Sequence, residues 1–329
     1  MKKLINVLST AAFGSAVALS LSVSTAHAQE WPTKEVRLVV PYAPGGTTDV
    51  LSRRVADLLK DELNANVVVE NRPGAGSTVA TGRLARGGRD ADHTILMASP
   101  GHTIGAAIYP SLAYDPVEDF LFIQNMLDIP NVMVVPANSP YESAVEFIEA
   151  AQDNNMSFSS SGVGSSIHMS GELFKTLTGS NMTHVPFAGS GAALPALLGG
   201  DVDVSFENMP TVFSHIQSGD LRALAVTSEE RSEFLPDVPT LKEIGEHNLD
   251  QLVTTAWFGL IAHNSFPEEA FATMQEALQQ VMEREEFTNF VEQLGGEKGT
   301  IGGDEFKTFV ADEVARWDAV AAEAGLRQE

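Results

Sequence analysis

The stretch "VVPYAPGGTTDVLSRRVADLL", Val39 to Leu59, passes from an apolar run through a turn rich in proline and glycine into a helical pattern. From Val50 onward the apolar residues recur at the three- and four-residue spacing of an α-helix with one buried face. The sequence therefore predicts a strand, a turn and a helix, with Thr47, Thr48 or Asp49 at the N-cap. The residues expected on the buried face are Val50, Leu51, Val55, Leu58 and Leu59.

The turn that opens this helix has the properties of an anion-binding site. The first N–H groups of a helix have no partner within it, and together with the helix dipole they favour a negatively charged ligand. Gly45 and Gly46 would let such a ligand approach the backbone closely. An ordinary capped turn explains the same residues, so the two interpretations have to be separated by the rest of the chain.

Short apolar runs and helical patterns continue to alternate along the chain. This alternation predicts an α/β fold with mostly parallel sheets flanked by helices. The predicted strands are Val36–Val40, Val67–Glu70, Thr94–Ala98, Ser157–Ser160, Met182–Val185, Val202–Phe206 and Leu221–Thr227. The predicted helices lie near Asp49–Leu63, Thr78–Arg86, Ala144–Gln152, Pro267–Glu283 and Asp304–Ala324, and further helices are predicted between the last four of these strands.

Two longer extended segments interrupt this alternation. Phe120–Ala137 reads as two strands with a turn near residues 129–131, and Leu252–Asn264 reads as one long strand. If both segments cross between two α/β units, the first domain is discontinuous. The predicted domains are residues 29–130 with 251–329, and residues 131–250. Two crossings form a hinge, and the cleft between two such domains is the default place for a ligand.

Three further glycine turns precede helical patterns, in Val67–Ala85, Ser159–Lys175 and His184–Gly200. The first has Val79 where a G-x-G-x-x-G dinucleotide fingerprint ends in glycine, and the chain has no G-x4-G-K-S/T phosphate loop. Four such turns, two in each predicted domain, indicate helix N-termini that converge on a polar, anionic ligand. Other candidate residues that follow predicted strands are Ser99, Gly101, His102 and Asn208.

A serine hydrolase is the competing interpretation of the third turn, because Ser165 and Ser166 lie close to His168. The chain lacks the G-x-S-x-G elbow, and no acid is placed to orient the histidine. We expect one serine to cap the helix and the hydroxyl groups to face the cleft.

The first 28 residues have the layout of a secretory signal peptide. Lys2 and Lys3 precede an apolar stretch, and Ala26-His27-Ala28 matches a cleavage site, which predicts a mature chain from Gln29. No later segment is apolar for long enough to cross a bilayer, so we expect a soluble periplasmic protein.

Composition narrows the class of protein further. The formal charge of −24 would become −26 on removal of Lys2 and Lys3, which argues against nucleic acid and anionic membranes as partners. The chain has no cysteine, and its histidines show no metal-binding spacing, so we expect no disulfide, metal or cofactor.

Several motifs, in order along almost the whole mature chain, resemble the Bug-type, or TctC, periplasmic substrate-binding proteins of tripartite tricarboxylate transporters. They include "VVPYAPGGTTDVLSRRVADLL", "VVVENRPGAG", "SSSGVGSSIHMSGELFK", "HVPFAGSGAALPALLGGDVDVSFEN" and "TAWFGLIA". The resemblance implies a two-domain, type II-like binding protein that closes around an organic carboxylate. The implied partners are the large and small subunits of an ion-driven membrane permease, and we expect the binding protein itself to be a monomer and not an enzyme.

The resemblance also implies which residues hold the ligand. One turn, Gly45 to Asp49, opposes the turn from Gly162 to His168, with backbone amides, hydroxyl groups and water between them. Ala188, Gly189 and Asn208 would line the second-domain wall and Ser99 to His102 the first, with apolar contact from Tyr42 and Phe187. The full implied set is Tyr42, Gly45, Gly46, Thr47, Thr48, Asp49, Ser99, Gly101, His102, Gly162, Gly164, Ser165, Ser166, His168, Phe187, Ala188, Gly189 and Asn208.

The sequence departs from the family pattern at three places. Asp92-His93-Thr94 follows an unusual "RGGRDA", Glu207 stands in Phe206-Glu207-Asn208 where the pattern has aspartate, and Gly105 stands where asparagine is usual. These differences leave the identity of the carboxylate open. The sequence also leaves open a sensory role, in which the closed protein presents its ligand to a membrane histidine kinase instead of a permease.

Overall fold

In the computed structural model, which describes residues 31–109, 111–323 and 325–327, ten strands join into one hydrogen-bonded sheet. Its order is β2-β1-β3-β9-β4-β7-β5-β6, and β8 and β10 pair with β4. The predicted signal peptide, residues 1–28, and its cleavage site after Ala28 lie outside the described residues. The strands are β1 (Val36–Val40), β2 (Val67–Asn71), β3 (Thr94–Ala98), β4 (Phe120–Pro136), β5 (Met156–Ser160), β6 (Met182–Pro186), β7 (Val204–Asn208), β8 (Leu221–Val226), β9 (Thr255–His263) and β10 (Glu297–Lys298).

The strands at each end of this order are parallel, whereas the strands in the middle are antiparallel. β1 pairs in parallel with β2 and β3, and β5 pairs in parallel with β6 and β7. Between them, β9 runs antiparallel to β3 and β4, and β4 runs antiparallel to β7 and β8. The predicted α/β fold, with two mostly parallel sheets joined by two crossing segments, is confirmed, and the crossing segments are themselves strands.

The long crossing strand β4 corrects one prediction. The sequence predicts a turn near residues 129–131, but β4 runs without interruption from Phe120 to Pro136. It pairs with β9 as far as Pro130 and with β7 from Asn131 onward. Proline cannot donate a backbone hydrogen bond, so it is tolerated where a strand exchanges one partner for another. The proline that suggests a turn in the sequence therefore marks this exchange instead.

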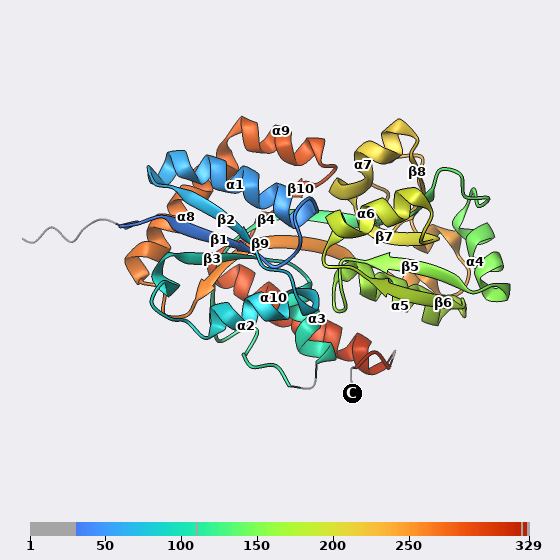
Figure 1. Cartoon of the computed structure of the whole chain (residues 1–329), viewed down its shortest axis with the longest axis horizontal. Coiled ribbons are helices and arrows are strands. Elements are labelled where there is room, and N and C mark those ends of the chain that lie inside the picture. The colour runs from blue at the N-terminus through green and yellow to red at the C-terminus, as the bar shows by residue number, and fades with distance from the viewer. Residues whose placement is uncertain (1–30, 110, 324, 328–329) are drawn as a thin grey trace, which may run out of the picture. The chain divides into compact units, whose positions relative to one another are not determined.

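Helices cover both faces of each half of the sheet (Figure 1). Successive residues of β4 point to opposite faces, so Met133 and Val135 pack with α4 and α5 whereas Val132 and Val134 pack with α6 and α7. In the other half, α1, α8 and α9 cover one face, and α2 and α10 cover the other. The helices are α1 (Thr47–Leu63), α2 (Thr78–Ala85), α3 (Gly101–Ile108), α4 (Ala144–Asp153), α5 (Ser166–Thr178), α6 (Ser190–Gly199), α7 (Met209–Ser218), α8 (Glu268–Glu283), α9 (Glu285–Gln293) and α10 (Gly303–Glu323), with short 3-10 helices at Ala75–Ser77, Ala91–His93, Lys242–Ile244 and Leu249–Gln251.

The start of α1 differs from the prediction in two details. Its N-cap is Gly46, which offers no side chain, so the predicted N-cap at Thr47, Thr48 or Asp49 is wrong. The carboxylate of Asp49 instead turns back within the first turn and accepts the N–H of Gly45 at 2.9 Å. Val50 is 37% exposed and lies off the buried face, which contains the other four predicted residues.

Candidate functional site

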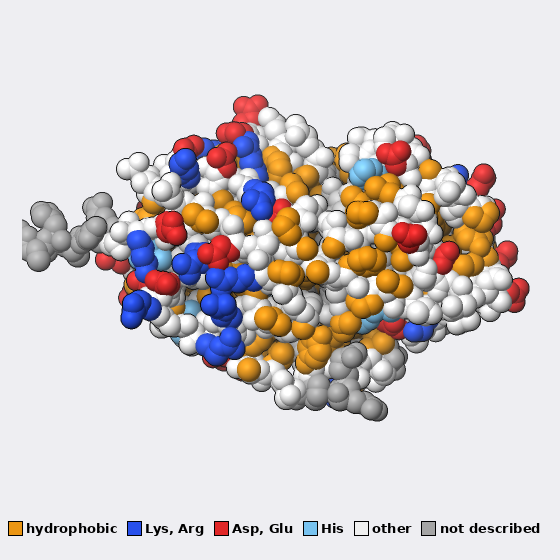
Figure 2. Space-filling model, in the orientation of Figure 1, with side chains coloured by type: hydrophobic (Ala, Val, Ile, Leu, Met, Phe, Trp, Pro, Cys, Tyr) orange, Lys and Arg blue, Asp and Glu red, His pale blue; other side chains and the backbone are white. Residues whose placement is uncertain are grey.

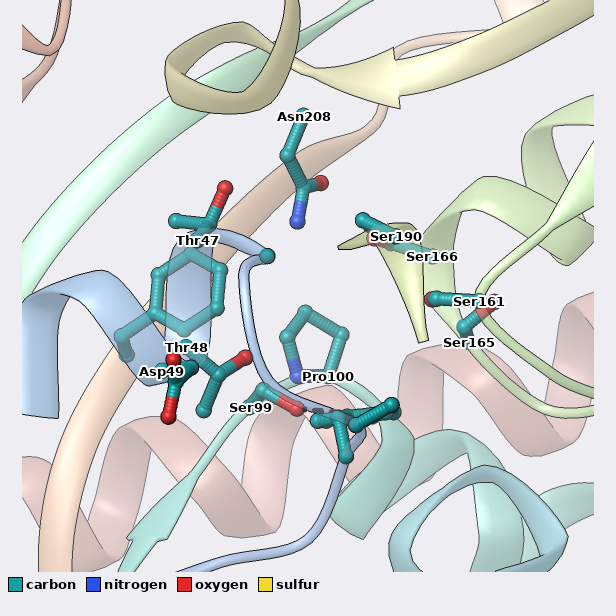
Figure 3. Close-up of a pocket in the computed structure, with 14 residues that line it drawn as sticks. Thr47, Thr48, Asp49, Ser99, Pro100, Ser161, Ser165, Ser166, Ser190 and Asn208 are labelled. Atoms are coloured by element: carbon teal, nitrogen blue, oxygen red, sulfur yellow. Dashed lines mark hydrogen bonds between the residues drawn. The ribbon is translucent and has the colours of Figure 1, made fainter. Parts of the chain in front are cut away.

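Five strand-to-helix turns meet at one cavity, beyond the carboxyl ends of β1, β3, β5, β6 and β7 (Figure 3). This edge of an α/β sheet is where ligands commonly bind, because the helix N-termini point there. The cavity has a volume of about 20 Å³, which is room for about one water molecule. Its lining residues are Tyr42, Ala43, Gly46, Thr47, Thr48, Asp49, Ser99, Pro100, Ser161, Ser165, Ser166, Ser190, Asn208 and Phe258.

This lining is rich in hydroxyl groups and contains no lysine or arginine. Seven of its members are serine or threonine, and Asp49 is its one charged residue among those the structure describes. A hydroxyl group can donate one hydrogen bond and accept others. Together with the free N–H groups at the helix starts, this lining can bind oxygen atoms of a ligand by hydrogen bonds rather than by ion pairs.

Asp49 orders the first turn of α1. Its carboxylate accepts hydrogen bonds from the N–H of Gly45 at 2.9 Å, from Arg53 Nε at 3.0 Å and from Asn71 Nδ2 at 2.8 Å. Burial alone would raise the pKa of Asp49, but the hydrogen bonds from Arg53, Gly45 and Asn71 hold it below its usual range. Asp49 is therefore an ionised residue that positions the turn and whose charge is balanced by Arg53.

The opposite wall includes the N-terminus of α5. Ser165 is the N-cap, as the sequence predicts, since its Oγ accepts the N–H of His168 at 3.2 Å. The same hydroxyl group donates to the carbonyl of Gly162 at 2.8 Å, which fixes the glycine turn. Ser166 and Ser161 lie beside it in the cavity lining. The hydroxyl group of Ser165 thus makes its hydrogen bonds to the backbone. On this wall, the hydroxyl groups that a ligand can use are those of Ser161 and Ser166.

Glu207 and Asn208 end β7, and Asn208 lines the cavity. Asn208 Oδ1 is buried and has no hydrogen-bond partner among the described residues, and Figure 3 shows the carboxamide directed into the cavity. Glu207 is fully buried and accepts hydrogen bonds from Ser190 Oγ at 2.5 Å and from the N–H of Asn208 at 2.9 Å. Burial raises the pKa of Glu207 to about 7, against the lowering effect of these two hydrogen bonds. Ser190 and Asn208, which both line the cavity, are thus hydrogen-bonded to a carboxyl group whose pKa is near neutral pH.

The turns from the two halves of the sheet touch each other at glycines. The N–H of Ala43 donates to the carbonyl of Ala188 at 2.8 Å, and the hydroxyl groups of Thr47 and Thr211 are 3.0 Å apart. A Cβ atom on Gly191 would lie 2.2 Å from the carbonyl oxygen of Pro44, and one on Gly76 would lie 2.0 Å from that of Val163. These distances are far below van der Waals contact, so the two walls approach this closely only because neither glycine has a side chain.

A second cavity of about 380 Å³ adjoins the first, since Tyr42 and Ser161 line both. Gly162, Phe187 and Ala188 line this second cavity. The structure therefore brings twelve of the predicted ligand-binding residues to the two adjoining cavities. They are Tyr42, Gly46, Thr47, Thr48, Asp49, Ser99, Gly162, Ser165, Ser166, Phe187, Ala188 and Asn208.

The two predicted histidines lie behind the site and not in it. His102 is fully buried, its Nε2 lies 2.6 Å from the carbonyl of Pro116, and burial lowers its pKa to about 4. His168 Nδ1 accepts the N–H of Gly164 at 3.2 Å, and its ring lies 4.1 Å from that of His184. Burial, with a smaller effect of Lys175, lowers the pKa of His168 to about 4. Both histidines support the turns from within the protein core.

The four predicted glycines outside the lining act through the backbone. Gly45 donates to Asp49, and a Cβ on Gly164 would lie 3.1 Å from Ile108. A Cβ on Gly101 would lie 2.2 Å from the carbonyl oxygen of Gly76, and one on Gly189 would lie 2.9 Å from the nitrogen of Ala43. Because these residues have no side chain, the loops around the cavities can pack closely.

Five residues that line the first cavity are absent from the predicted set, namely Ala43, Pro100, Ser161, Ser190 and Phe258. Four of them stand within or next to the predicted turns and strand ends, so a wider window around each turn includes them. Phe258 lies within β9, where the apolar sequence predicts a core residue and nothing signals a cavity. In the sequence, Glu207 stands out only as a departure from the family pattern. Its contact with Ser190 could not be predicted, because it depends on the pairing of distant segments.

A larger cavity of about 650 Å³ lies along β4, β9 and the loop after β8, but its charges are unsuited to an anion. Its lining contains six carboxylates, whereas its two cationic side chains already have partners. Arg231 pairs with Glu243 at 2.8 Å, and Lys298 donates to the carbonyl of Met282 at 3.1 Å. The six carboxylates are Asp128, Glu229, Glu230, Glu233, Glu292 and Glu297.

In the part of the chain that the structure describes, no helix is both long and apolar enough to cross a membrane. Within the same residues, no three histidine, aspartate or glutamate side chains are grouped so that they could hold a metal ion.

Two α/β halves joined by crossing strands, with a cavity of hydroxyl groups and helix N-termini between them, define a protein of the two-domain periplasmic binding class. The chain belongs to the TctC family, the receptors of the tripartite tricarboxylate transporter family, whose model matches residues 51–326. The resemblance seen in the sequence is thereby confirmed, and family members are periplasmic binding proteins.

Individual relatives match over nearly their whole length. Protein BugT from Bordetella pertussis is 32% identical over 321 residues, which are 96% of this chain and 97% of BugT. The periplasmic binding protein BugD superposes with a TM-score of 0.86 at 29% identity and covers 91% of this chain and all of its own. R. palustris Rpa4515 with adipate has a TM-score of 0.83 at 32% identity and covers 90% of this chain and 99% of its own.

Proposed function

We propose that this protein captures a small organic carboxylate in the periplasm and delivers it to the membrane permease of a tripartite tricarboxylate transporter. The observation that carries the proposal is the convergence of five strand-to-helix turns on one cavity lined by hydroxyl groups. Free N–H groups at helix starts bind carboxylate oxygens without a cationic side chain. The adipate-bound relative supports a carboxylate as the ligand.

Movement of two domains is part of this proposal. The cavity of about 20 Å³ is too small for an organic acid, and glycine turns from both halves close it. Ligand entry therefore requires the turns to separate, which we assign to rotation of residues 131–250 against residues 29–130 with 251–329. The crossing strands β4 and β9 would act as the hinge. A ligand that touches both walls binds the closed form more tightly and so increases its population.

The binding role is favoured over a catalytic one by the state of the serine and histidine side chains. Ser165 Oγ is used as a helix cap, and His168 Nδ1 is used by the N–H of Gly164. In a serine hydrolase the histidine would instead accept the proton of the nucleophile. Presentation of the ligand to a membrane kinase would use the same closed form, and a pull-down of the membrane partner separates it from transport.

A thermal-shift panel of organic acids, run on residues 29–329, tests the ligand class. A ligand at 100 times its Kd stabilises a protein by about 2.7 kcal/mol, and we expect the matching acid to raise Tm by several degrees. Neutral amides of the same acids are the control and should leave Tm unchanged. If no acid shifts the Tm of protein freed of co-purified ligand, the carboxylate proposal is contradicted. Ester hydrolysis that His168→Ala abolishes would then favour the hydrolase.

Substitution of one residue on each wall tests the site. We expect Asp49→Ala and Ser166→Ala each to weaken binding of the acid found in the panel by about tenfold. Asp49→Ala removes the hydrogen bonds that order the first turn of α1, and Ser166→Ala removes a hydroxyl group that lines the cavity. Isothermal titration measures the Kd, and Tm reports whether the fold is kept. Asp57→Ala is the matched control, since Asp57 lies on the exposed side of α1. Unchanged affinity in both site variants would refute the site assignment.

A further inference from the structure

A further cavity, separate from those described above, gathers arginine side chains in a protein that is otherwise strongly acidic. The chain has 20 lysine and arginine residues against 44 aspartate and glutamate residues. Four of the 20, namely Arg37, Arg72, Arg83 and Arg89, line one cavity of about 170 Å³. Figure 2 shows Lys and Arg side chains concentrated over the end of the molecule that carries β1, β3 and α2. This cavity shares no lining residue with the candidate carboxylate site.

The four arginines come from different elements that only the fold brings together. Arg37 lies on β1, Arg72 follows β2, Arg83 lies on α2, and Arg89 belongs to the loop before β3. That loop is held in place, because the carbonyl of Ala85 lies 3.1 Å from His263 Nε2. A Cβ on Gly87, whose φ is +63°, would lie 3.1 Å from the same ring. The "RGGRDA" sequence that departs from the family pattern is this ordered loop.

The local carboxylates neutralise only part of the positive charge of these arginines. Glu70 is shared between Arg37, at 2.8 Å, and Arg72. Asp90, the one carboxylate in the cavity lining, lies 2.6 Å from Lys34 and 3.9 Å from Arg37. Among the residues that the structure describes, neither Arg83 nor Arg89 has a carboxylate oxygen within 4.0 Å. Two guanidinium groups therefore remain available at the cavity.

We propose that this arginine cavity binds a phosphate group. A guanidinium group presents its N–H donors in a planar fork that matches the oxygens of a phosphate, and the two forks of Arg83 and Arg89 together suit its multiple charge. The cavity is smaller than the range of about 300 to 1,000 Å³ typical of sites for larger ligands, so it fits one oxyanion group. The phosphate group belongs either to free inorganic phosphate or to the headgroup of an anionic lipid.

The lipid source would give the acidic protein a preferred orientation at the membrane. A strongly negative protein is repelled by an anionic bilayer, and a concentrated basic patch is the part of its surface that the bilayer attracts. Binding of free phosphate would instead be independent of any bilayer. The two sources make the same contacts in the cavity, so the experiment needs one arm for each.

Titration of inorganic phosphate into the mature protein, followed by the arginine Nε–H resonances, is the first arm. Flotation with vesicles of phosphatidylglycerol, against vesicles of phosphatidylcholine, is the second. We expect Arg83→Gln/Arg89→Gln to weaken the observed binding by about tenfold or more, since two charge-assisted contacts are lost. Both residues are exposed, so the fold should survive, and an unchanged Tm checks this.

Two control variants separate this cavity from other anion sites. Arg231→Gln removes one exposed arginine elsewhere, and Asp49→Ala alters the carboxylate site, and neither should change the binding of phosphate or vesicles. Binding of phosphate alone, or of phosphatidylglycerol vesicles alone, supports the proposal and names the source. Binding to neither, or equal binding by Arg83→Gln/Arg89→Gln and the wild type, overturns it. Since a carboxylate can still bind the other cavity, this result leaves the proposed transport function intact.

Discussion

Gly191→Ala is expected to weaken carboxylate binding by about tenfold to a hundredfold, because overpacking of a tight contact costs about 1 to 3 kcal/mol. The new Cβ would lie 2.2 Å from the carbonyl oxygen of Pro44, on the turn that faces α6. Backbone cannot rotate out of the way as a side chain can, so the two walls would have to stay apart. Alanine suits the first turn of a helix, so we expect little change in Tm. Isothermal titration with the acid identified in the panel measures the effect.

Gly199→Ala is the matched control, at the other end of the same helix. A Cβ at Gly199 meets only Asp201 Oδ2, at 3.7 Å, so this variant should bind as the wild type does. Small-angle scattering provides a second measurement, in which saturating acid compacts the wild type and the control but not Gly191→Ala. Equal affinity and equal compaction in all three proteins would show that the glycine contact is not needed for binding, and the proposed closure would fail.

Glu207 is expected to make the free energy of unfolding fall as the pH rises toward 7. Its pKa is raised from 4.5 to about 7 by burial, so the native state keeps a proton that the unfolded chain has lost. Between these two pH values the native state binds more protons than the unfolded state, and the free energy of unfolding therefore falls as pH rises. The fall is complete just above pH 7. One pKa unit corresponds to about 1.4 kcal/mol, so Glu207 destabilises the native state by about 3 kcal/mol at pH 8 relative to acid pH.

Glu207→Gln should remove this part of the pH dependence, because glutamine keeps the acceptor for Ser190 and Asn208 and has no proton to lose. Urea unfolding at pH 5 and pH 8 measures it, and the variant should gain more stability over the wild type at pH 8 than at pH 5. Glu149→Gln, on the exposed side of α4, is the control for loss of a surface charge. Parallel pH profiles for the wild type and Glu207→Gln would mean that Glu207 is ionised throughout, and the raised pKa would be wrong.

The regular elements of the fold were predicted closely from local patterns. The predicted strand Val36–Val40 coincides with β1, and the predicted strand Thr94–Ala98 coincides with β3. Hydrophobic period and turn residues specify such elements because both act over a few neighbouring residues. The missed elements α3 and α9 are short helices next to other elements, where the periodic pattern has little length in which to show. The predicted boundary between residues 130 and 131 falls inside the unbroken strand β4, so the strand itself does not mark a domain border. The predicted domain boundaries therefore stay a prediction.

The candidate site was predictable as far as it depends on glycine turns before helices. Gly46, Ser166 and Asn208 each follow a strand in the sequence, and the structure places all three at one cavity. His102 and His168 illustrate the opposite case. Their residue type suggests chemistry, but whether a histidine faces a cavity or the core depends on the packing of distant segments. His102 lies against the carbonyl of Pro116, and the ring of His168 packs against that of His184 on β6, and neither contact is encoded by a local pattern.

The sequence by itself determined the α/β class, the glycine turns and the strands they follow, because these depend on short-range sterics and on burial period. Only the tertiary structure decided which turns share a cavity and at which residue the pairing partner of β4 changes from β9 to β7. It placed Glu207 against Ser190. It also decided that Arg37, Arg72, Arg83 and Arg89 meet at one place. These features depend on the order of strands in the sheet, and that order is set by long-range packing among segments that the chain separates by tens of residues.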